Sequence, residues 1–158
     1  MKRIGTLMKS FGLLLLLCVI SSAGATPPTD VNIVAETSLL GIPSPFVASG
    51  PAVDDGLICS AGEVIDLSGK VTGFSPNGFN FHGIKHFTCD DGSGEVFVNI
   101  QARIDFRKGI TFRWNVLGGT SSYEDLHGAG SGIGISGVPC GDPDSCTLDI
   151  YDGGLHID

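Results

Sequence analysis

One turn in the chain reads Gly118-Gly119-Thr120-Ser121-Ser122-Tyr123-Glu124-Asp125-Leu126-His127-Gly128, and it directly follows a strand-like run at residues 110–117. Glycines then recur at every second position from Gly128 to Gly134. Interior glycines weaken a strand, so a row of them on one face usually marks strong curvature or the close approach of a ring or another backbone. The turn and the glycine row therefore predict a closed sheet in which Tyr123 or Trp114 fills the space above the glycines.

Strand-like segments recur along the whole chain. They are separated by turn-forming sequences such as Ser75-Pro76-Asn77-Gly78. No segment shows a sustained helical period, although residues 123–126 are expected to form a single helical turn. Short strands at regular spacing predict an all-β sandwich or barrel. The predicted strands are residues 56–65, 69–74, 79–89, 94–105, 110–117, 128–136 and 147–151.

Residues 1–25 have the layout of a secretory signal peptide. Lys2, Arg3 and Lys9 form a basic start, residues 11–20 are apolar, and small residues precede the cleavage expected near Ala25. The apolar run is much shorter than the about 20 residues that a membrane-spanning helix needs, so no membrane span is predicted. We expect a secreted or periplasmic protein of bacterial type. Residues 26–45, rich in proline, are expected to form an extended lead with at most one strand, and residues 46–158 a single β-barrel domain.

The chain is acidic. It has 17 Asp and Glu against 9 Lys and Arg, and loss of the three basic signal residues leaves six, a formal net charge of −11. Such a charge disfavours nucleic acid and anionic membrane surfaces as partners, because phosphate binding depends on clustered Lys and Arg. The one basic cluster is spread over a predicted hairpin and consists of Arg103, Arg107, Lys108 and Arg113.

Four cysteines remain after loss of Cys18, an even number that indicates two disulfides in an oxidising compartment. Cys140 and Cys146 flank a turn-forming run that can bring their Cα atoms within disulfide range. We therefore predict a Cys140–Cys146 pair and, by elimination, a Cys59–Cys89 pair. A zinc site is disfavoured because it would use Cys-x-x-Cys pairs, which the chain does not contain.

Two strands alternate clearly between an apolar and a polar face. The apolar faces contain Val96, Val98, Ile100, Ala102, Ile104 and Phe106 on one strand and Ile110, Phe112, Trp114 and Val116 on the next. The simpler interpretation buries the apolar faces and leaves Arg103, Asp105 and Arg113 in water. The alternative inverts the faces and lines a barrel lumen with the polar groups. Periodicity alone does not separate the two.

The turn at residues 118–128 resembles the Gly-Gly-(Ser/Thr)-Gly-x-(Phe/Tyr)-x-x-x-x-Gly turn of allene oxide cyclase barrels and plant dirigent proteins, and looks closer still to secreted bacterial members of that superfamily. The similar stretch runs from about residue 87 to 134, and differs at Ser121, where glycine is usual. The resemblance implies an eight-stranded antiparallel barrel of calycin type, often a homo-oligomer, with an apolar lumen. The plant members cyclise a fatty epoxide or steer radical coupling without a cofactor.

Three functions are compatible with such a barrel. A binding protein would hold a small apolar ligand among aromatic side chains, for which the candidates are Phe79, Phe81, Phe97, Phe112 and Trp114. A cofactor-independent cyclase or isomerase would need inward-facing polar groups, for which the candidates are Glu95, Arg103, Asp105, Arg113 and Tyr123. A structural envelope or matrix protein would have a filled interior. Binding is favoured, because no acid–base pair stands out in the sequence.

No metal site is predicted. His82 and His86 share a strand face, but four residues of strand place them about 13 Å apart, too far to bind one metal ion together. The acidic turns lack the spacing of a dedicated calcium loop, so their Asp residues are interpreted as turn formers.

Overall fold

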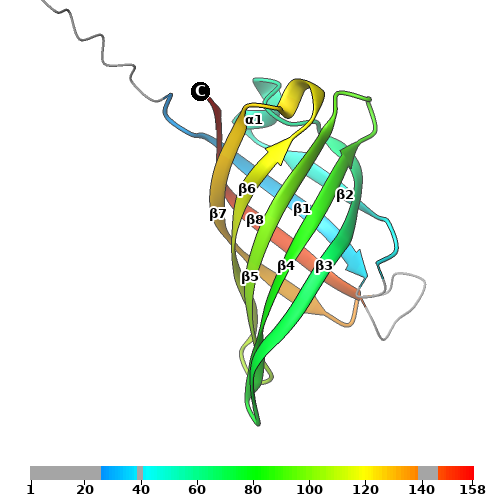
Figure 1. The fold of residues 1–158 in the computed structure, drawn as a ribbon, viewed down its shortest axis with the longest axis vertical. Helices are drawn as coiled ribbons and strands as arrows, with labels where there is room; N and C mark the ends of the chain where they lie inside the picture. The colour runs from blue at the N-terminus through cyan, green and yellow to red at the C-terminus, as the bar shows by residue number, and fades with distance from the viewer. Residues whose placement is uncertain (1–25, 39–40, 139–145) are drawn as a thin grey trace, which may run out of the picture.

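The computed structural model describes residues 26–38, 41–138 and 146–158, which form a closed barrel of eight antiparallel strands in sequence order (Figure 1). This confirms the predicted all-β fold and the eight-stranded antiparallel barrel. The strands are β1 (Thr29–Ser38), β2 (Ser44–Ser49), β3 (Ala61–Ser75), β4 (Gly78–Cys89), β5 (Glu95–Asp105), β6 (Gly109–Gly119), β7 (Leu126–Ser136) and β8 (Cys146–Ile157). In the described part of the chain, no helix has both the length and the apolar composition that crossing a membrane requires.

The predicted N-terminal lead contains the strand that closes the barrel. β1 pairs with β8 along its whole length, from Thr29 opposite Leu155 to Ser38 opposite Cys146. The barrel domain therefore begins at Thr29 rather than at residue 46, which corrects the expected boundary. The short apolar run in this segment looks isolated in the sequence because its partner strand is about 120 residues away, as the Asn32–Asp152 hydrogen bond shows.

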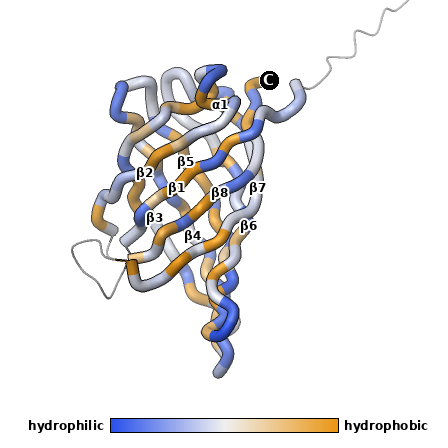
Figure 2. Tube along the Cα trace, turned by 180° about the vertical axis from the view of Figure 1, so that it is seen from behind, coloured by the Kyte–Doolittle hydropathy of each residue, from blue (hydrophilic) through white to orange (hydrophobic). Residues whose placement is uncertain are grey.

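The apolar faces of the strands point into the barrel. Val96, Val98 and Ile100 are all at most 5% exposed, whereas Arg103 and Arg113 are exposed on the outer surface. The alternation of apolar and polar residues is visible along β1 and β8 in Figure 2. The simpler of the two interpretations of the strand faces is therefore confirmed for these side chains, whereas Phe106, expected on the buried apolar face, is 60% exposed.

One end of the barrel, which we call the closed end, is covered by a short helix and a 3-10 turn. These are α1 (Pro51–Asp54) and η1 (Ser121–Tyr123), the latter close to the predicted helical turn. The predicted Cys59–Cys89 disulfide is confirmed here, with the Cα atoms 5.9 Å apart. The second predicted disulfide includes Cys140, which lies outside the described residues, as does the predicted signal peptide.

The glycine row on β7 faces the interior and is covered by rings, as predicted. A Cβ atom on Gly130 would meet Trp114 Nε1, and one on Gly132 would meet the ring of Phe112. Trp114 is thus one of the two rings expected there, and Phe112 is an additional one. The Trp114 indole also donates a hydrogen bond of 3.2 Å to the carbonyl of Ser131, which lies on β7 between the two glycines.

Ser121 takes the place of the glycine expected in the turn before β7. Its φ is 55°, and among the described residues it is the sole non-glycine residue with a positive φ. The left-handed conformation is unfavourable for a residue with a Cβ. The turn therefore keeps the backbone conformation that glycine would adopt without strain.

A β-bulge in β3 decides which way the next residues face. The β3–β4 register shifts between Asp66 and Ser68, and Leu67 is left 53% exposed. Beyond the bulge, Lys70 lies opposite the exposed His82, and Val71 opposite Phe81, whose ring points inward. Since side chains alternate between faces, the bulge is what turns Lys70 outward and Val71 inward.

Candidate functional site

The lumen contains a cavity at the end of the barrel opposite α1 and η1, which we call the open end. Its volume is about 180 Å³. Most of the wall is apolar and consists of Phe79, Phe81, Ile100, Ala102, Ile104, Ile110 and Phe112. The polar groups that line it are Thr37, Asp66, Lys85, Ser136, Thr147 and Asp149.

Alternation along β4 explains how a lysine comes to line this cavity. Phe81, Gly83, Lys85 and Phe87 occupy successive inward positions of the strand, and Lys85 is 5% exposed. The ring of Phe81 lies where side chains on Gly69 and Gly83 would otherwise be. Two glycines on neighbouring strands therefore let one aromatic ring lie flat on the wall.

Lys85 forms a buried ion cluster with two carboxylates. Its Nζ lies 2.8 Å from Asp66 Oδ1 and 3.4 Å from Asp149 Oδ2. The Thr37 hydroxyl donates a further hydrogen bond of 3.1 Å to Asp149 Oδ2. Burying three charged groups carries a large desolvation penalty, which their mutual attraction offsets only when the geometry is good.

Burial raises the pKa of the Asp149 carboxyl above its ordinary value, and the nearby Lys85 ammonium opposes this shift. Burial likewise raises the pKa of Tyr151, with the Asp149 and Asp66 carboxylates adding to the effect. The Tyr151 hydroxyl is buried and has no hydrogen-bond partner among the described residues. Groups with perturbed pKa values beside a cavity are typical of functional sites.

Three of the five predicted ligand-binding aromatics line the cavity: Phe79, Phe81 and Phe112. Trp114 is buried next to it and packs edge-on against Tyr151, with ring centroids 6.2 Å apart. Phe97 is different, since it stacks on His86 at 4.7 Å and belongs to the outward-facing set of β5. Its assignment to the lumen is therefore corrected: it lies on the polar face of a strand whose apolar face fills the core.

The candidate catalytic groups on β5 and β6 lie outside the lumen. Arg103 and Arg113 border a groove on the outer face that also includes His82. Asp105 accepts hydrogen bonds from the backbone N–H groups of Arg107 and Lys108, and the first of these lowers its carboxyl pKa. The inverted-face arrangement that the cyclase hypothesis needed is therefore absent from these strands.

Glu95 and Tyr123 lie toward the closed end. Glu95 Oε2 is 3.2 Å from His86 Nε2, in a half-buried pair. The Tyr123 side chain is buried, and its hydroxyl is 2.6 Å from Ser93 Oγ and near the sulfur of Cys89. The five predicted catalytic residues are thus distributed over the outer face and the closed end, and none of them lines the cavity.

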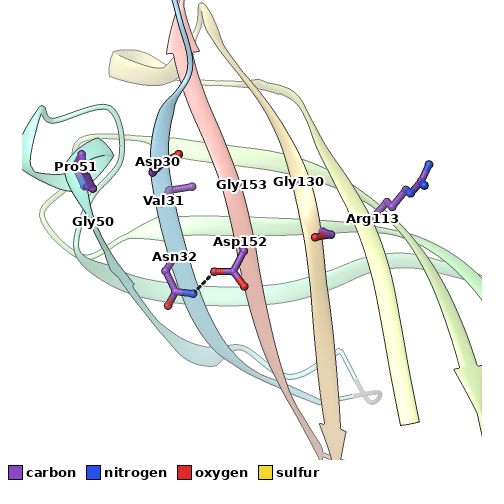
Figure 3. Close-up of a pocket in the computed structure, with 10 residues that line it drawn as sticks. Asp30, Val31, Asn32, Gly50, Pro51, Arg113, Gly130, Asp152 and Gly153 are labelled. Carbon is purple, nitrogen blue, oxygen red and sulfur yellow. Dashed lines mark hydrogen bonds between the residues drawn. The ribbon is translucent and has the colours of Figure 1, made fainter. Parts of the chain in front are cut away.

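A second hollow lies on the outer face across β1, β6, β7 and β8 (Figure 3). It is an open groove in which Asn32 Nδ2 donates a hydrogen bond of 2.7 Å to Asp152 Oδ1. Arg113 extends from its edge away from the other labelled residues. Its polar groups are solvent-exposed or already paired, so the lumenal cavity is the stronger candidate site.

The histidines do not assemble a metal site in the described part of the chain. His127 and His156 stack with ring centroids 5.6 Å apart, and each lies near an oxygen of Asp158. Within residues 26–38, 41–138 and 146–158, no group of three or more His, Cys, Asp or Glu side chains could hold a metal ion.

The fold and the cavity define this protein as an eight-stranded antiparallel β-barrel with a lumenal cavity at one end. Comparison with known proteins finds no matching family model, no matching curated protein and no matching solved structure. Membership of the allene oxide cyclase-like superfamily therefore stays a prediction from the residues of the turn.

Proposed function

We propose that this protein binds a small apolar ligand in the lumenal cavity, with a hydrogen-bond donor of the ligand directed at the ion cluster of Lys85, Asp66 and Asp149. The observation that supports this proposal is the cavity itself, which combines an aromatic and aliphatic wall with a few convergent polar groups. That combination is typical of small-molecule sites. A purely structural role would require a filled interior, whereas the open end contains the cavity.

The size of the cavity limits the ligand. A dry cavity of about 150 Å³ is large enough to bind benzene, and the cavity here measures about 180 Å³. We therefore expect the enclosed part of the ligand to be a single ring or a short hydrocarbon chain. A longer ligand would extend past Phe79 and Ile104 at the open end.

The ion cluster limits the polar group of the ligand. One ammonium and two carboxylates sum to a formal charge of −1, and protonation of Asp149 would raise this only to zero. A ligand carboxylate would therefore enter a region without net positive charge, at a high desolvation cost. A hydroxyl or an ammonium group, which donates hydrogen bonds to carboxylate oxygens, is the better match.

Native mass spectrometry of the mature, oxidised protein tests the proposal first. A bound apolar molecule is expected, and titration with 1-octanol, octylammonium and octanoate should show octanoate weakest by tenfold or more. Ala102→Met should weaken octanol binding by filling the cavity, whereas Ala129→Met, on the outer face of β7, should not change it. A bare mass together with no binding of any of the three probes would refute the proposal.

An isomerase or cyclase activity is the second candidate, and it is favoured by the position of Asp149 on the cavity wall together with the raised pKa of its carboxyl. A carboxyl whose pKa is raised by burial beside an apolar cavity is suited to general acid catalysis. This version uses Asp149 and Lys85 in place of the predicted residues. If the bound ligand is converted, Asp149→Asn should abolish the conversion while leaving octanol binding within a few fold.

We also propose that the protein acts outside the cytoplasm. The buried Cys59–Cys89 disulfide fits an oxidising compartment. N-terminal sequencing of protein recovered from an exporting host should place the first residue at Thr26. An N-terminus at Met1 would contradict the proposal.

A further inference from the structure

Two neighbouring hairpins extend beyond the barrel at the open end (Figure 1). Their ends carry exposed aromatic side chains. We call this region the tip and define it as residues 70–82 of the β3–β4 hairpin and 103–111 of the β5–β6 hairpin. Phe74 is 77% exposed and Phe106 60% exposed. Both contact the half-buried Phe79, with ring centroids 5.9 and 6.0 Å apart.

This aromatic cluster is continuous with the cavity. Phe79 lines the cavity and also contacts the two exposed rings. Val71, which the bulge at Leu67 turns toward the same face, is 51% exposed. An apolar surface therefore leads from water, over the tip, to the cavity.

The tip is basic although the protein is acidic. It carries four exposed cations, Lys70, Arg103, Arg107 and Lys108, against one carboxylate, Asp105, for a formal charge of +3. The other described residues carry two cations, Lys85 and Arg113, and 14 acidic groups, for a formal charge of −12. Within the described residues, none of the four tip cations forms an ion pair.

We propose that the tip docks on the surface of an anionic lipid bilayer, with Phe74 and Phe106 in the headgroup region and the four cations against lipid phosphates. Aromatic rings beside Lys and Arg are the combination that binds membrane interfaces. The acidic remainder of the barrel does not prevent this, because exposed charges are screened beyond about 8 Å at physiological ionic strength. The net charge of the whole chain predicts repulsion from such surfaces, because a net charge does not reveal that the fold gathers the positive charges at the tip.

The shape of the tip favours a lipid surface over a second protein. Two narrow turns that project from a barrel offer little area to a flat protein partner, whereas a specific protein interface buries about 800 Å² on each side. Insertion of two side chains into a headgroup layer needs no complementary surface. Docking at this end would also place the cavity next to the bilayer.

Co-sedimentation with lipid vesicles tests the proposal on the full mature chain. Binding is expected to vesicles of seven parts phosphatidylcholine and three parts phosphatidylglycerol at 0.1 M salt, and to be much weaker with pure phosphatidylcholine. Arg107→Gln with Lys108→Gln should lower the partition coefficient about 25-fold, since each cation near an anionic surface contributes about fivefold. Arg113→Gln, a neutralised cation outside the tip, should change it by less than twofold.

The aromatic contribution is tested separately. Phe74→Ser with Phe106→Ser should lower partition at least about tenfold, because two large apolar side chains are removed from the interface. The matched control is Val47→Ser with Leu117→Ser, which removes two similarly exposed apolar side chains (59% and 55%) outside the tip. Melting temperatures of all variants should stay close to that of the parent protein.

Three outcomes would overturn the proposal. The first is no binding to anionic vesicles, and the second is binding that the two tip variants leave intact. The third is a concentration-dependent dimer in sedimentation velocity that the Phe74→Ser, Phe106→Ser variant abolishes, since the tip would then bind a second copy of the chain. Octanol binding is measured without lipid, so failure here leaves the proposed cavity function untouched.

Discussion

The two ends of the barrel differ in what fills them. At the closed end, Tyr123, Leu126 and Leu155 are each at most 2% exposed. At the open end, the interior holds Lys85, Asp66 and Asp149 beside a cavity of about 180 Å³. The same strands form both ends, so the difference comes from the side chains and from the segments that cover each end.

The closed end is built for stability. The Cys59–Cys89 disulfide links the loop after α1 to the end of β4, and Ala52 of α1 is completely buried. Burial of apolar side chains and a cross-link both lower the free energy of the folded state relative to the unfolded chain.

The interior of the open end contributes less to the stability of the fold than the interior of the closed end. A buried ion cluster is at best a weak contributor, and the cavity leaves part of the wall without packing partners. Proteins tolerate such costs mainly where they serve a function. The contrast between the two ends therefore supports the proposal that the ligand binds at the open end.

Among the variants considered, Lys85→Met, at the open end, should produce the largest loss of stability. It leaves the buried Asp149 carboxylate and the half-buried Asp66 carboxylate without their cation, for which a cost of about 3–5 kcal/mol is expected. Urea unfolding should show a loss that shrinks as the pH falls, because protonation removes the unpaired charges. Lys70→Met, at an exposed position, should stay within about 0.5 kcal/mol; equal effects of the two variants would contradict the ion-cluster interpretation.

Removal of the disulfide by Cys59→Ser with Cys89→Ser weakens the closed end. The cysteines are 30 residues apart, and the chain-entropy estimate for such a loop is about 3–4 kcal/mol. The unfolding midpoint should fall accordingly, while octanol affinity at the other end should stay the same. A loss of octanol affinity as large as the loss of stability would show that the two ends are not independent.

Gly132→Ala tests the packing of rings on the glycine row. The added Cβ would meet the Ile150 carbonyl oxygen and the ring of Phe112, and overpacking of this kind costs about 1–3 kcal/mol. Because Phe112 lines the cavity, octanol affinity should fall as well. The control, Ser131→Ala on the outer face of the same strand, should change neither quantity noticeably.

Ser121→Gly should stabilise the closed end. The left-handed conformation costs a residue with a Cβ about 1–2 kcal/mol. The greater conformational freedom of glycine in the unfolded chain is destabilising and offsets about 0.5–1 kcal/mol of this gain. We expect a net gain of about 1 kcal/mol or less in thermal unfolding. Ser122→Gly, next to it and without a positive φ, should be destabilising instead.

Among these variants, Asp149→Asn should have the smallest effect on stability when stability is measured near neutral pH. Relief of the desolvation penalty of the carboxylate there offsets the lost contact with Lys85. Its effect is on the pH profile. The pKa of Asp149 is raised from 3.8 in the folded state, so its contribution to stability is present below that value and is lost as the pH rises through the folded pKa. The free energy of unfolding of the variant, measured from pH 3 to 7, should lack this decline, and a parallel profile would show that Asp149 is not the group responsible.

Local patterns were enough to predict much of this molecule. The alternation in residues 95–106 and 110–117 and the turn before Gly128 predicted several of the strands and the closed sheet. The even cysteine count, together with the turn-forming run between Cys140 and Cys146, predicted the Cys59–Cys89 pair by elimination. Phe79, Phe81 and Phe112 were correctly placed on the lumen side, because an apolar strand face is buried by default.

The ion cluster was missed although a signal for it exists. Lys85 occupies an inward position between Gly83 and Phe87, and a charged residue on an otherwise apolar face is unusual. Its partners come from β3 and β8, at positions 66 and 149, and no local pattern connects residues so far apart. β1 was missed as a barrel strand for the same reason, since its pairing with β8 is not local.

The sequence by itself determined most of the strands, the alternation of their two faces and the overall acidity, because each depends on neighbouring residues or on composition. Only the tertiary structure decided that β1 closes the barrel, that Lys85 meets Asp66 and Asp149 beside a cavity, and that four cations and two phenylalanines gather on the tip. These features join residues from different strands. Their positions follow from barrel closure and from the bulge at Leu67, which a one-dimensional pattern does not contain.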